Sequence, residues 1–120
     1  MIPQIEGLYM IHTYSCISNN ENIFKIGRSN NLYNRITSYS NGSICYLVIE
    51  SMESKIDEYE VLKIFNNKYK NIKFYGNEYF EGDKEDMIIT MKKYIYEKYN
   101  KPRIISKSFL LLTYNRYILN

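Results

Sequence analysis

Apolar and polar residues near the start of the chain follow the pattern of a β-hairpin. Residues 7–14 form an apolar run that predicts a strand, residues 15–21 a polar turn, and residues 22–27 a second strand. This arrangement would place Tyr9 and Lys25 on neighbouring strands. Whether the two side chains share one face depends on the strand register, because a slip of one residue inverts every side chain.

A short helix and a third strand are predicted next. Ser29 or Asn30 can cap a helix, and the apolar positions of this helix recur at helical spacing, at Leu32, Ile36 and Tyr39. Arg35 lies beside this stripe, so its stem can follow the edge of the core while its guanidinium reaches the end of the sheet. A turn signal at residues 41–43 then precedes a strand at residues 44–50.

A longer helix is predicted from Ser54 to about Asn66, where Ser54 and Asp57 have nearly the spacing of a capping box. One face of this helix carries Glu58, Leu62, Phe65 and Tyr69. A carboxylate on an apolar face needs a cation or hydrogen bonds, because burying it unpaired is costly. Glu58 could instead complement the helix dipole or stay solvated, and Glu60 takes its place if the helical phase is shifted.

The remaining predicted elements are expected to have structural roles. Residues 77–80 are interpreted as the segment that locks the last core strand or turn. Glu78 is assigned a structural role, with contact to the site as the less favoured alternative. A helix from Asp83 to about Tyr99 carries a Met and Tyr stripe that is typical of a core face. The apolar tail at residues 104–120 should not stay bare in water, so we expect it to pack on the domain or to form a homodimer contact.

Length and composition favour one globular domain. The chain has 120 residues, and 45% of them are hydrophobic and 24% charged, which is ordinary for such a protein. We therefore predict an α+β fold, with a small central three-stranded antiparallel sheet flanked by helices over residues 1–100 and a tail at residues 101–120. No apolar run approaches the ~18 residues of a membrane span, and the start lacks the basic region of a signal peptide. An intracellular location is expected, cytoplasmic or nuclear.

Cysteine count and charge narrow the chemistry. Cys16, Cys45 and His12 cannot complete a four-ligand zinc site, and both cysteines are expected to be free thiols. The net charge is +3. Lysine-rich stretches could neutralise a polyanion such as DNA, although a solvated lysine face explains them equally well.

Two short motifs carry a family resemblance. Gly7-Leu8-Tyr9 opens the first predicted strand, Lys25-Ile26-Gly27 lies in the second, and Arg35 follows eight residues after Gly27. Over Gly7 to Phe80 the chain resembles the GIY-YIG nuclease superfamily, in its viral and phage branch, with Lys25 where the family usually has tyrosine. The 14 tyrosines and the many Ile, Asn and Lys residues are also what an AT-rich viral or phage coding sequence would produce; such a protein would act in the host cell.

This resemblance implies metal-dependent hydrolysis of a DNA phosphodiester. Tyr9 would orient or deprotonate the attacking water, and Glu58 would hold one divalent cation, Mg²⁺ or Mn²⁺. Arg35 would compensate the charge of the transition state. Arg28 and Tyr39 would contact the substrate, Arg28 through a phosphate.

The role of Lys25 stays open between two chemistries. As a cation it would stabilise charge or lower the pKa of a neighbouring tyrosine, and as a neutral amine it could be the base. Two other functions also stay open for the whole chain. It could bind DNA as a catalytically weak or inactive regulatory module, or it could be an assembly protein on the same scaffold.

Overall fold

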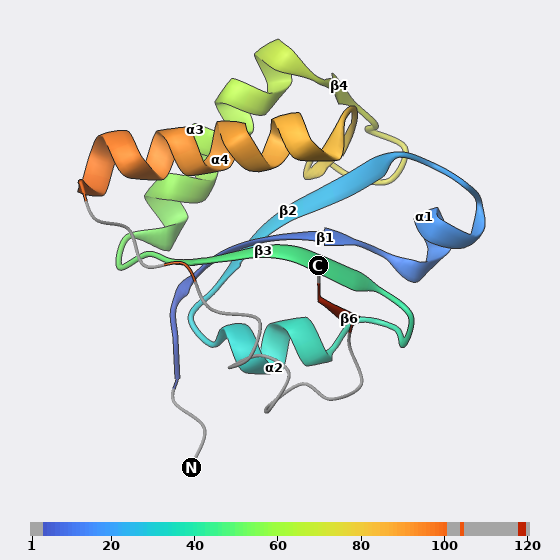
Figure 1. Ribbon diagram of the computed structural model, residues 1–120, viewed down its shortest axis with the longest axis horizontal. Helices are drawn as coiled ribbons and strands as arrows, with labels where there is room; N and C mark the ends of the chain where they lie inside the picture. The colour runs from blue at the N-terminus through green and yellow to red at the C-terminus, as the bar shows by residue number, and fades with distance from the viewer. Residues whose placement is uncertain (1–3, 101–103, 105–117, 120) are drawn as a thin grey trace.

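The computed structural model describes residues 4–100, 104 and 118–119, and these residues build an α+β fold (Figure 1). The strands form one six-stranded sheet in the order β4-β5-β2-β1-β3-β6, antiparallel except for the β3–β6 pair. The elements along the chain are β1 (Gly7–His12), α1 (Tyr14–Ser18), β2 (Ile23–Ser29), α2 (Leu32–Thr37), β3 (Ile44–Glu50), α3 (Ser54–Lys68), β4 (Lys70–Asn71), β5 (Tyr79–Glu81), α4 (Lys84–Tyr99) and β6 (Ile118–Leu119).

The three predicted strands are the centre of this sheet, in the order β2-β1-β3. The sheet has more strands than the three predicted, because β5 and β4 extend one edge and β6 pairs with the other. Strands of two or three residues leave no periodic signal in a sequence. The predicted turn after β1 is also partly helical, since α1 begins at Tyr14.

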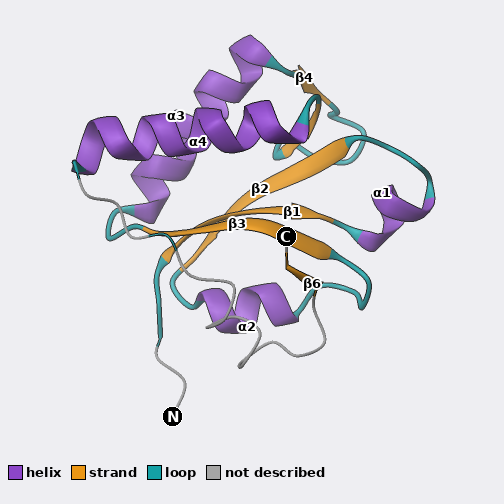
Figure 2. Ribbon diagram, viewed as in Figure 1, coloured by secondary structure: helices purple, strands orange, loops and turns teal. Residues whose placement is uncertain are grey.

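The sheet is covered on both faces (Figures 1 and 2). α3 and α4 lie over one face, and α2 lies against the other. Two groups of buried side chains fill these layers, and Tyr9 and Ile11 belong to the layer under α2. In the β1–β2 ladder Tyr9 lies opposite Gly27 and Ile11 opposite Lys25. Because side chains alternate along a strand, Tyr9 and Lys25 therefore leave the sheet on the same face.

The phase of α3 differs from the predicted one. Its buried side chains are Ser54, Asp57, Val61 and Phe65. Glu58 lies one position around the helix from this stripe and is half-buried at its edge. Glu60 forms an ion pair with Lys63 and is 41% exposed. The helical phase therefore keeps Glu58, and not Glu60, beside the sheet.

Helix ends follow the predicted chemistry only in part. α2 is capped by the side chain of Asn31, which directly follows the two predicted caps, Ser29 and Asn30, and Asp83 caps α4. The Ser54-x-x-Asp57 pattern does not cap α3, since Glu53 occupies the N-cap position and no side-chain bond is made there.

The carboxylate of Asp57 instead joins α3 to α4. It is fully buried and accepts hydrogen bonds from Ser51, Tyr94, Lys98 and Tyr99. Burial alone would raise the pKa of this carboxyl, but the bonds from Lys98 and the hydroxyls hold its pKa below the usual value. Asp57 is thus an anionic anchor between two helices.

The tail prediction falls mostly outside the described residues. Within the tail, Ile104 forms a bridge with Ile49, and β6 pairs in parallel with Ile44 and Cys45 of β3. In the described part of the chain, no helix is both long enough and apolar enough to cross a membrane.

Candidate functional site

The hydroxyl of Tyr9 lies on the α2 side of the sheet and belongs to a polar cluster. The members of this cluster, described in turn below, are Tyr9, Lys25, Arg28, Arg35, Tyr39, Glu58 and Glu78, together with Ser54 and Glu6, which hold Arg28. Tyr9 is fully buried, its hydroxyl lies 2.6 Å from that of Tyr39, and it accepts a hydrogen bond from Arg35 Nε at 3.3 Å. Burial raises the pKa of Tyr9, although both hydrogen bonds oppose this shift. Tyr9 is therefore a neutral phenol near pH 7.

Gly27 makes room for this tyrosine. A Cβ atom at Gly27 would lie 2.3 Å from the Cζ and hydroxyl oxygen of Tyr9. Because no real Cβ comes so close to another heavy atom, only glycine fits opposite Tyr9 in the β1–β2 ladder. The two sequence motifs thus depend on each other: the glycine of the second accommodates the ring of the first.

Lys25 lies near Tyr9 and is largely buried. Its side chain is 14% exposed, and its Nζ atom lies 3.9 Å from a carboxylate oxygen of Glu78. The same Nζ lies 5.1 Å from the ring centroid of Tyr39 and 5.7 Å from that of Tyr79. Burial lowers the pKa of Lys25, Arg35 adds to this effect, and the carboxylate of Glu78 opposes it. The environment thus shifts Lys25 toward the neutral amine.

Glu58 and Glu78 form a pair of carboxyl groups next to Lys25. Burial raises the pKa of Glu58 to about 7, and the charge of Glu78 and a hydrogen bond with it act in the same direction. Arg28 and Lys25 oppose the shift without cancelling it. Two carboxyl groups this close to each other repel when both are ionised, and a bound proton or cation relieves that repulsion.

Of the two roles considered for Glu78, the structure favours the less expected one, contact with the candidate site. Glu78 directly precedes β5, whose Tyr79 lies opposite Lys25 in the β2–β5 ladder. Its place in the site depends on this long-range pairing, which no local pattern reveals. The only sequence signal was its position in the Asn77–Phe80 segment. The predicted core role of this segment is confirmed, because Phe80 lies on a core strand and is fully buried.

Arg28 is fixed by a chain of hydrogen bonds that the sequence did not predict. Its Nε donates to Ser54 Oγ at 2.8 Å, and Ser54 Oγ donates to Glu6 Oε2 at 2.6 Å. The backbone N–H of Ser54 donates to the same oxygen at 3.1 Å. These bonds tie Arg28 to the first turn of α3, where its charge acts on Glu58 one turn further along the helix.

The donor set limits which metal could bind here. Within the described ranges, no group of three or more His, Cys, Asp or Glu side chains lies close enough to hold a metal ion. Glu58 and Glu78 offer oxygen atoms alone, which suits Mg²⁺, because this ion keeps several waters and takes further ligands from a phosphate. The pair therefore suits a hard divalent cation that takes its other ligands from water and phosphate.

The two cysteines do not take part in this cluster. Both are buried and free, as predicted. Burial raises the pKa of Cys45 to about 12, so its thiol is inert near neutral pH. His12 is also outside the cluster: its Nε2 lies 2.7 Å from the carbonyl oxygen of Glu21.

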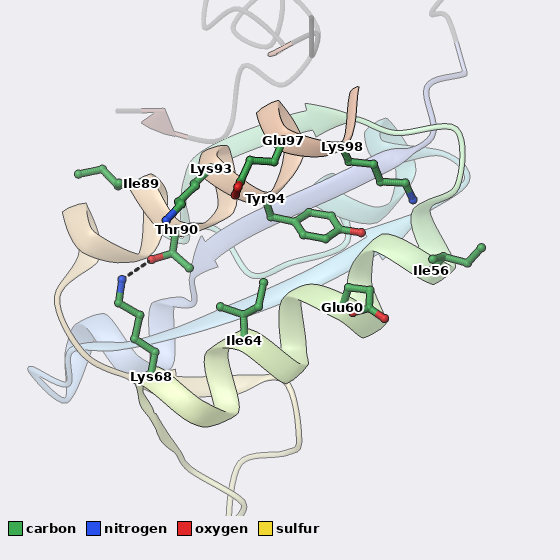
Figure 3. Close-up of a pocket in the computed structure, with 10 residues that line it drawn as sticks. All are labelled: Ile56, Glu60, Ile64, Lys68, Ile89, Thr90, Lys93, Tyr94, Glu97 and Lys98. Atoms are coloured by element: carbon green, nitrogen blue, oxygen red, sulfur yellow. Dashed lines mark hydrogen bonds between the residues drawn. The ribbon is translucent and has the colours of Figure 1, made fainter. Parts of the chain in front are cut away.

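A larger groove lies on the outer side of α3 and α4 and is separate from the cluster (Figure 3). It has a volume of about 880 Å³, and Glu60, Ile64 and Tyr94 contribute to its lining. None of Tyr9, Lys25, Arg28, Arg35, Tyr39 and Glu58 lines this groove. Glu60, the alternative to Glu58, thus faces a different part of the molecule.

Comparison with known protein families matches residues 7–95 to the T5orf172 domain. The chain belongs to the T5orf172 domain family. The match covers well over half of the chain and includes every residue of the cluster described above except Glu6. No curated protein and no solved structure matches the sequence. The T5orf172 assignment is consistent with a phage nuclease-like module.

Proposed function

We propose that this T5orf172 domain is a divalent-metal-dependent DNA endonuclease with a site of the GIY-YIG type. One observation carries the proposal. The Nζ atom of Lys25 lies 3.9 Å from a carboxylate oxygen of Glu78, and the charges of Arg35 and Glu58 also act on the pKa of Lys25. Arg35 in turn donates to Tyr9. A neutral phenol, an amine of lowered pKa, a hydrogen-bonded guanidinium and two carboxyl groups are thus neighbours around Lys25. These are the groups that phosphodiester hydrolysis requires.

Tyr9 and Arg35 orient the reactants in this proposal. The raised pKa of Tyr9 makes the phenol a poor base, so we assign it the task of orienting the attacking water through its hydroxyl. Arg35 keeps its charge at every relevant pH and has its guanidinium held by the Tyr9 hydroxyl. Its remaining donors can bind the phosphate, whose negative charge grows in the transition state.

Lys25 is the candidate general base. Burial lowers its pKa, which raises the fraction of neutral amine near neutral pH. A neutral amine can take the proton of the attacking water, and the resulting ammonium stays beside the carboxylate of Glu78. This assignment uses the lysine for the step that the phenol is unsuited to perform.

Glu58 and Glu78 would hold the cation, Mg²⁺ or Mn²⁺. When bound, such an ion supplies positive charge that stabilises the leaving oxygen and the phosphate. The protein contributes the two carboxyl groups and keeps Arg28 next to them through the bond to Ser54. Arg28 is then placed to contact a neighbouring phosphate, and Tyr39 to contact the substrate from the side of Tyr9.

Cleavage of supercoiled plasmid, single-stranded DNA and branched DNA, with Mg²⁺, Mn²⁺ or EDTA, tests the proposal. The wild-type chain should cut in the presence of either metal and not in EDTA. Tyr9→Phe and Glu58→Gln should each lower the rate at least about 100-fold. Glu60→Gln is the matched control, because it removes the same charge from the same helix on the groove side, and it should cut like the wild type.

Absence of cleavage on all substrates would refute the proposal. The same holds if Glu58→Gln and Glu60→Gln cut equally fast, or if EDTA leaves the rate unchanged. DNA binding without turnover would identify a binding module, and neither binding nor turnover an assembly protein.

A further inference from the structure

A smaller cavity of about 250 Å³ adjoins the cluster. Its volume is about eight times the ~30 Å³ that one water occupies in the liquid. It lies between α1, the loop after α2 and the start of β5, and four tyrosines line it, namely Tyr14, Tyr39, Tyr75 and Tyr79. The other lining residues are Ser, Thr and Cys. Among the described residues that form its wall, none carries a charge.

Two walls of the cavity are also walls of the proposed active site. Tyr39 makes the hydrogen bond to Tyr9, and Tyr79 lies opposite Lys25 in the β2–β5 ladder. The amine of Lys25 lies within 5.7 Å of both ring centroids. The rings of Tyr39 and Tyr79 therefore belong both to the neutral aromatic cavity and to the surroundings of Lys25 in the cluster.

The aromatic walls are held in place before any ligand arrives. The backbone N–H of Tyr14 donates to the buried Ser43 Oγ at 3.0 Å. Gly42 has a φ of 95°, and a Cβ atom there would lie 2.6 Å from the Tyr14 ring, so glycine lets this ring pack on the loop.

The opposite wall is fixed from the β5 side. The hydroxyl of Tyr75 donates to the carboxylate of Glu21 at 2.7 and 2.8 Å, and the rings of Tyr75 and Tyr79 pack edge to face at 5.8 Å. Half of the Tyr14 surface nevertheless remains accessible, at 50% exposure. A flat ligand can therefore reach this ring without displacing the wall.

We infer that this cavity binds one unstacked nucleobase of the DNA substrate, next to the phosphate that the arginines of the cluster would hold. A nucleobase is flat, uncharged and edged with hydrogen-bonding groups. Tyrosine rings match its faces, and the hydroxyls of Thr13, Ser15 and Ser40 can match its edges. A nucleotide joins such a base to a phosphate through one sugar, which fits an aromatic cavity beside a cluster that contains the proposed phosphate-binding arginine, Arg35.

The inference rests on the proposed function and narrows its substrate. A base that is paired and stacked in a duplex cannot enter such an aromatic cavity without being extruded. The site should therefore prefer single-stranded, branched or locally unpaired DNA over an intact duplex.

Equilibrium binding in EDTA tests the inference without requiring cleavage. The probes are a single-stranded thymidine oligonucleotide and an oligomer of equal length whose bases are all replaced by abasic sites, at one fixed salt concentration. The wild-type chain should bind the oligonucleotide with bases at least about 5-fold more tightly. Tyr14→Ala should weaken that binding by about 5- to 150-fold and leave the affinity for the abasic oligomer unchanged.

Tyr96→Ala is the matched control, because Tyr96 in α4 is 49% exposed and Tyr14 is 50% exposed, while Tyr96 lies outside the cavity. This variant should bind both oligomers like the wild type. Tyr14→Phe keeps the ring and should retain the preference for bases. If Tyr14→Ala fails to fold, the wild-type comparison of the two oligomers still decides.

Equal affinity of the wild type for the two oligomers would overturn the inference, and so would equal losses in Tyr14→Ala and Tyr96→Ala. The proposed function fails separately. Metal-dependent cleavage that Glu58→Gln abolishes, together with no base preference, would support the proposed nuclease function and refute the nucleobase-binding role of the cavity. A base preference that depends on Tyr14, together with no cleavage, would support nucleobase binding by the cavity and identify the protein as a DNA-binding module.

Discussion

Replacement of Asp57 by alanine should destabilise the fold more than any other single change of a helix carboxylate. The Asp57 side chain is fully buried and accepts hydrogen bonds from Tyr94 Oη at 2.8 Å, Tyr99 Oη at 2.6 Å and Lys98 Nζ at 2.6 Å, besides one from Ser51. Its removal leaves these donors without their acceptor and breaks the connection between α3 and α4. Loss of one partner of a buried ionic network costs about 3–5 kcal/mol, a large share of the ~5–15 kcal/mol that stabilises a typical domain.

Urea unfolding followed by circular dichroism measures this loss. With an m-value of ~1.5 kcal/mol/M, the unfolding midpoint of Asp57→Ala should fall by roughly 2–3 M. Asp86→Ala is the matched control, since Asp86 in α4 also accepts from a tyrosine and a lysine, at 2.5 Å from Tyr69 and 3.2 Å from Lys68, but is 44% exposed. We expect a much smaller change in this variant. Equal midpoints for the two variants would refute the reasoning from burial.

The pH dependence of stability gives a second test of the same network. The pKa of Asp57 is lowered in the folded state, so its stabilising contribution is fully present above the unfolded pKa of about 3.9. It is lost as the pH falls through the folded pKa. The difference in unfolding free energy between wild type and Asp57→Ala should therefore be constant near neutral pH and shrink on acidification below about pH 4. A difference that does not shrink would show that Asp57 acts through packing alone.

Three further predictions concern the cluster. Glu78→Gln removes the charge that helps raise the pKa of Glu58 to about 7, so a carboxyl NMR titration of the metal-free protein should show that pKa shifted toward acid; an unchanged value would contradict the pairing. Gly27→Ala places a Cβ atom 2.3 Å from the Tyr9 ring and should lower the unfolding free energy by about 1–3 kcal/mol, whereas a wild-type melting temperature would show that the ring moves freely. Lys25→Met should lower the cleavage rate at least about 100-fold, and a wild-type rate across the pH range would exclude both roles considered for the lysine.

Local periodicity was enough to predict the central elements of the fold. β3 spans residues 44–50 as predicted, and α4 begins one residue after its predicted start because Asp83 is the cap. These elements are long enough for alternation or helical spacing to appear in the sequence. β4 and β5 have two and three residues and are stabilised by their neighbours, so nothing in their own sequence predicts them.

Features that depend on long-range pairing could not be predicted from local patterns. Asp57 has the spacing of a capping residue, but its donors come from Ser51 and from the far end of α4. Glu78 reaches Lys25 only because β5 pairs with β2. Tyr9 and Lys25 share a face through a register that the sequence leaves open. For the site, the sequence could propose residue types, while the β2–β5 pairing and the packing of α3 bring those residues together.

Adjacent carboxyl groups on α3 respond to folding in opposite ways, and this difference separates stability from function. The pKa of Asp57 is lowered because hydroxyls and Lys98 donate to it, whereas the pKa of Glu58 is raised to about 7 by burial and by Glu78. A raised pKa means that the folded state disfavours the ionised form, so Glu58 destabilises the fold increasingly from about pH 4.5 up to about pH 7. Glu58→Gln should therefore be more stable than the wild type above pH 7, by on the order of 1 kcal/mol for a half-exposed group, and equally stable near pH 4. A carboxylate kept only for packing would show the opposite sign, because its replacement would cost stability at neutral pH. Stability gained together with cleavage lost is what we expect of a residue retained for its chemistry.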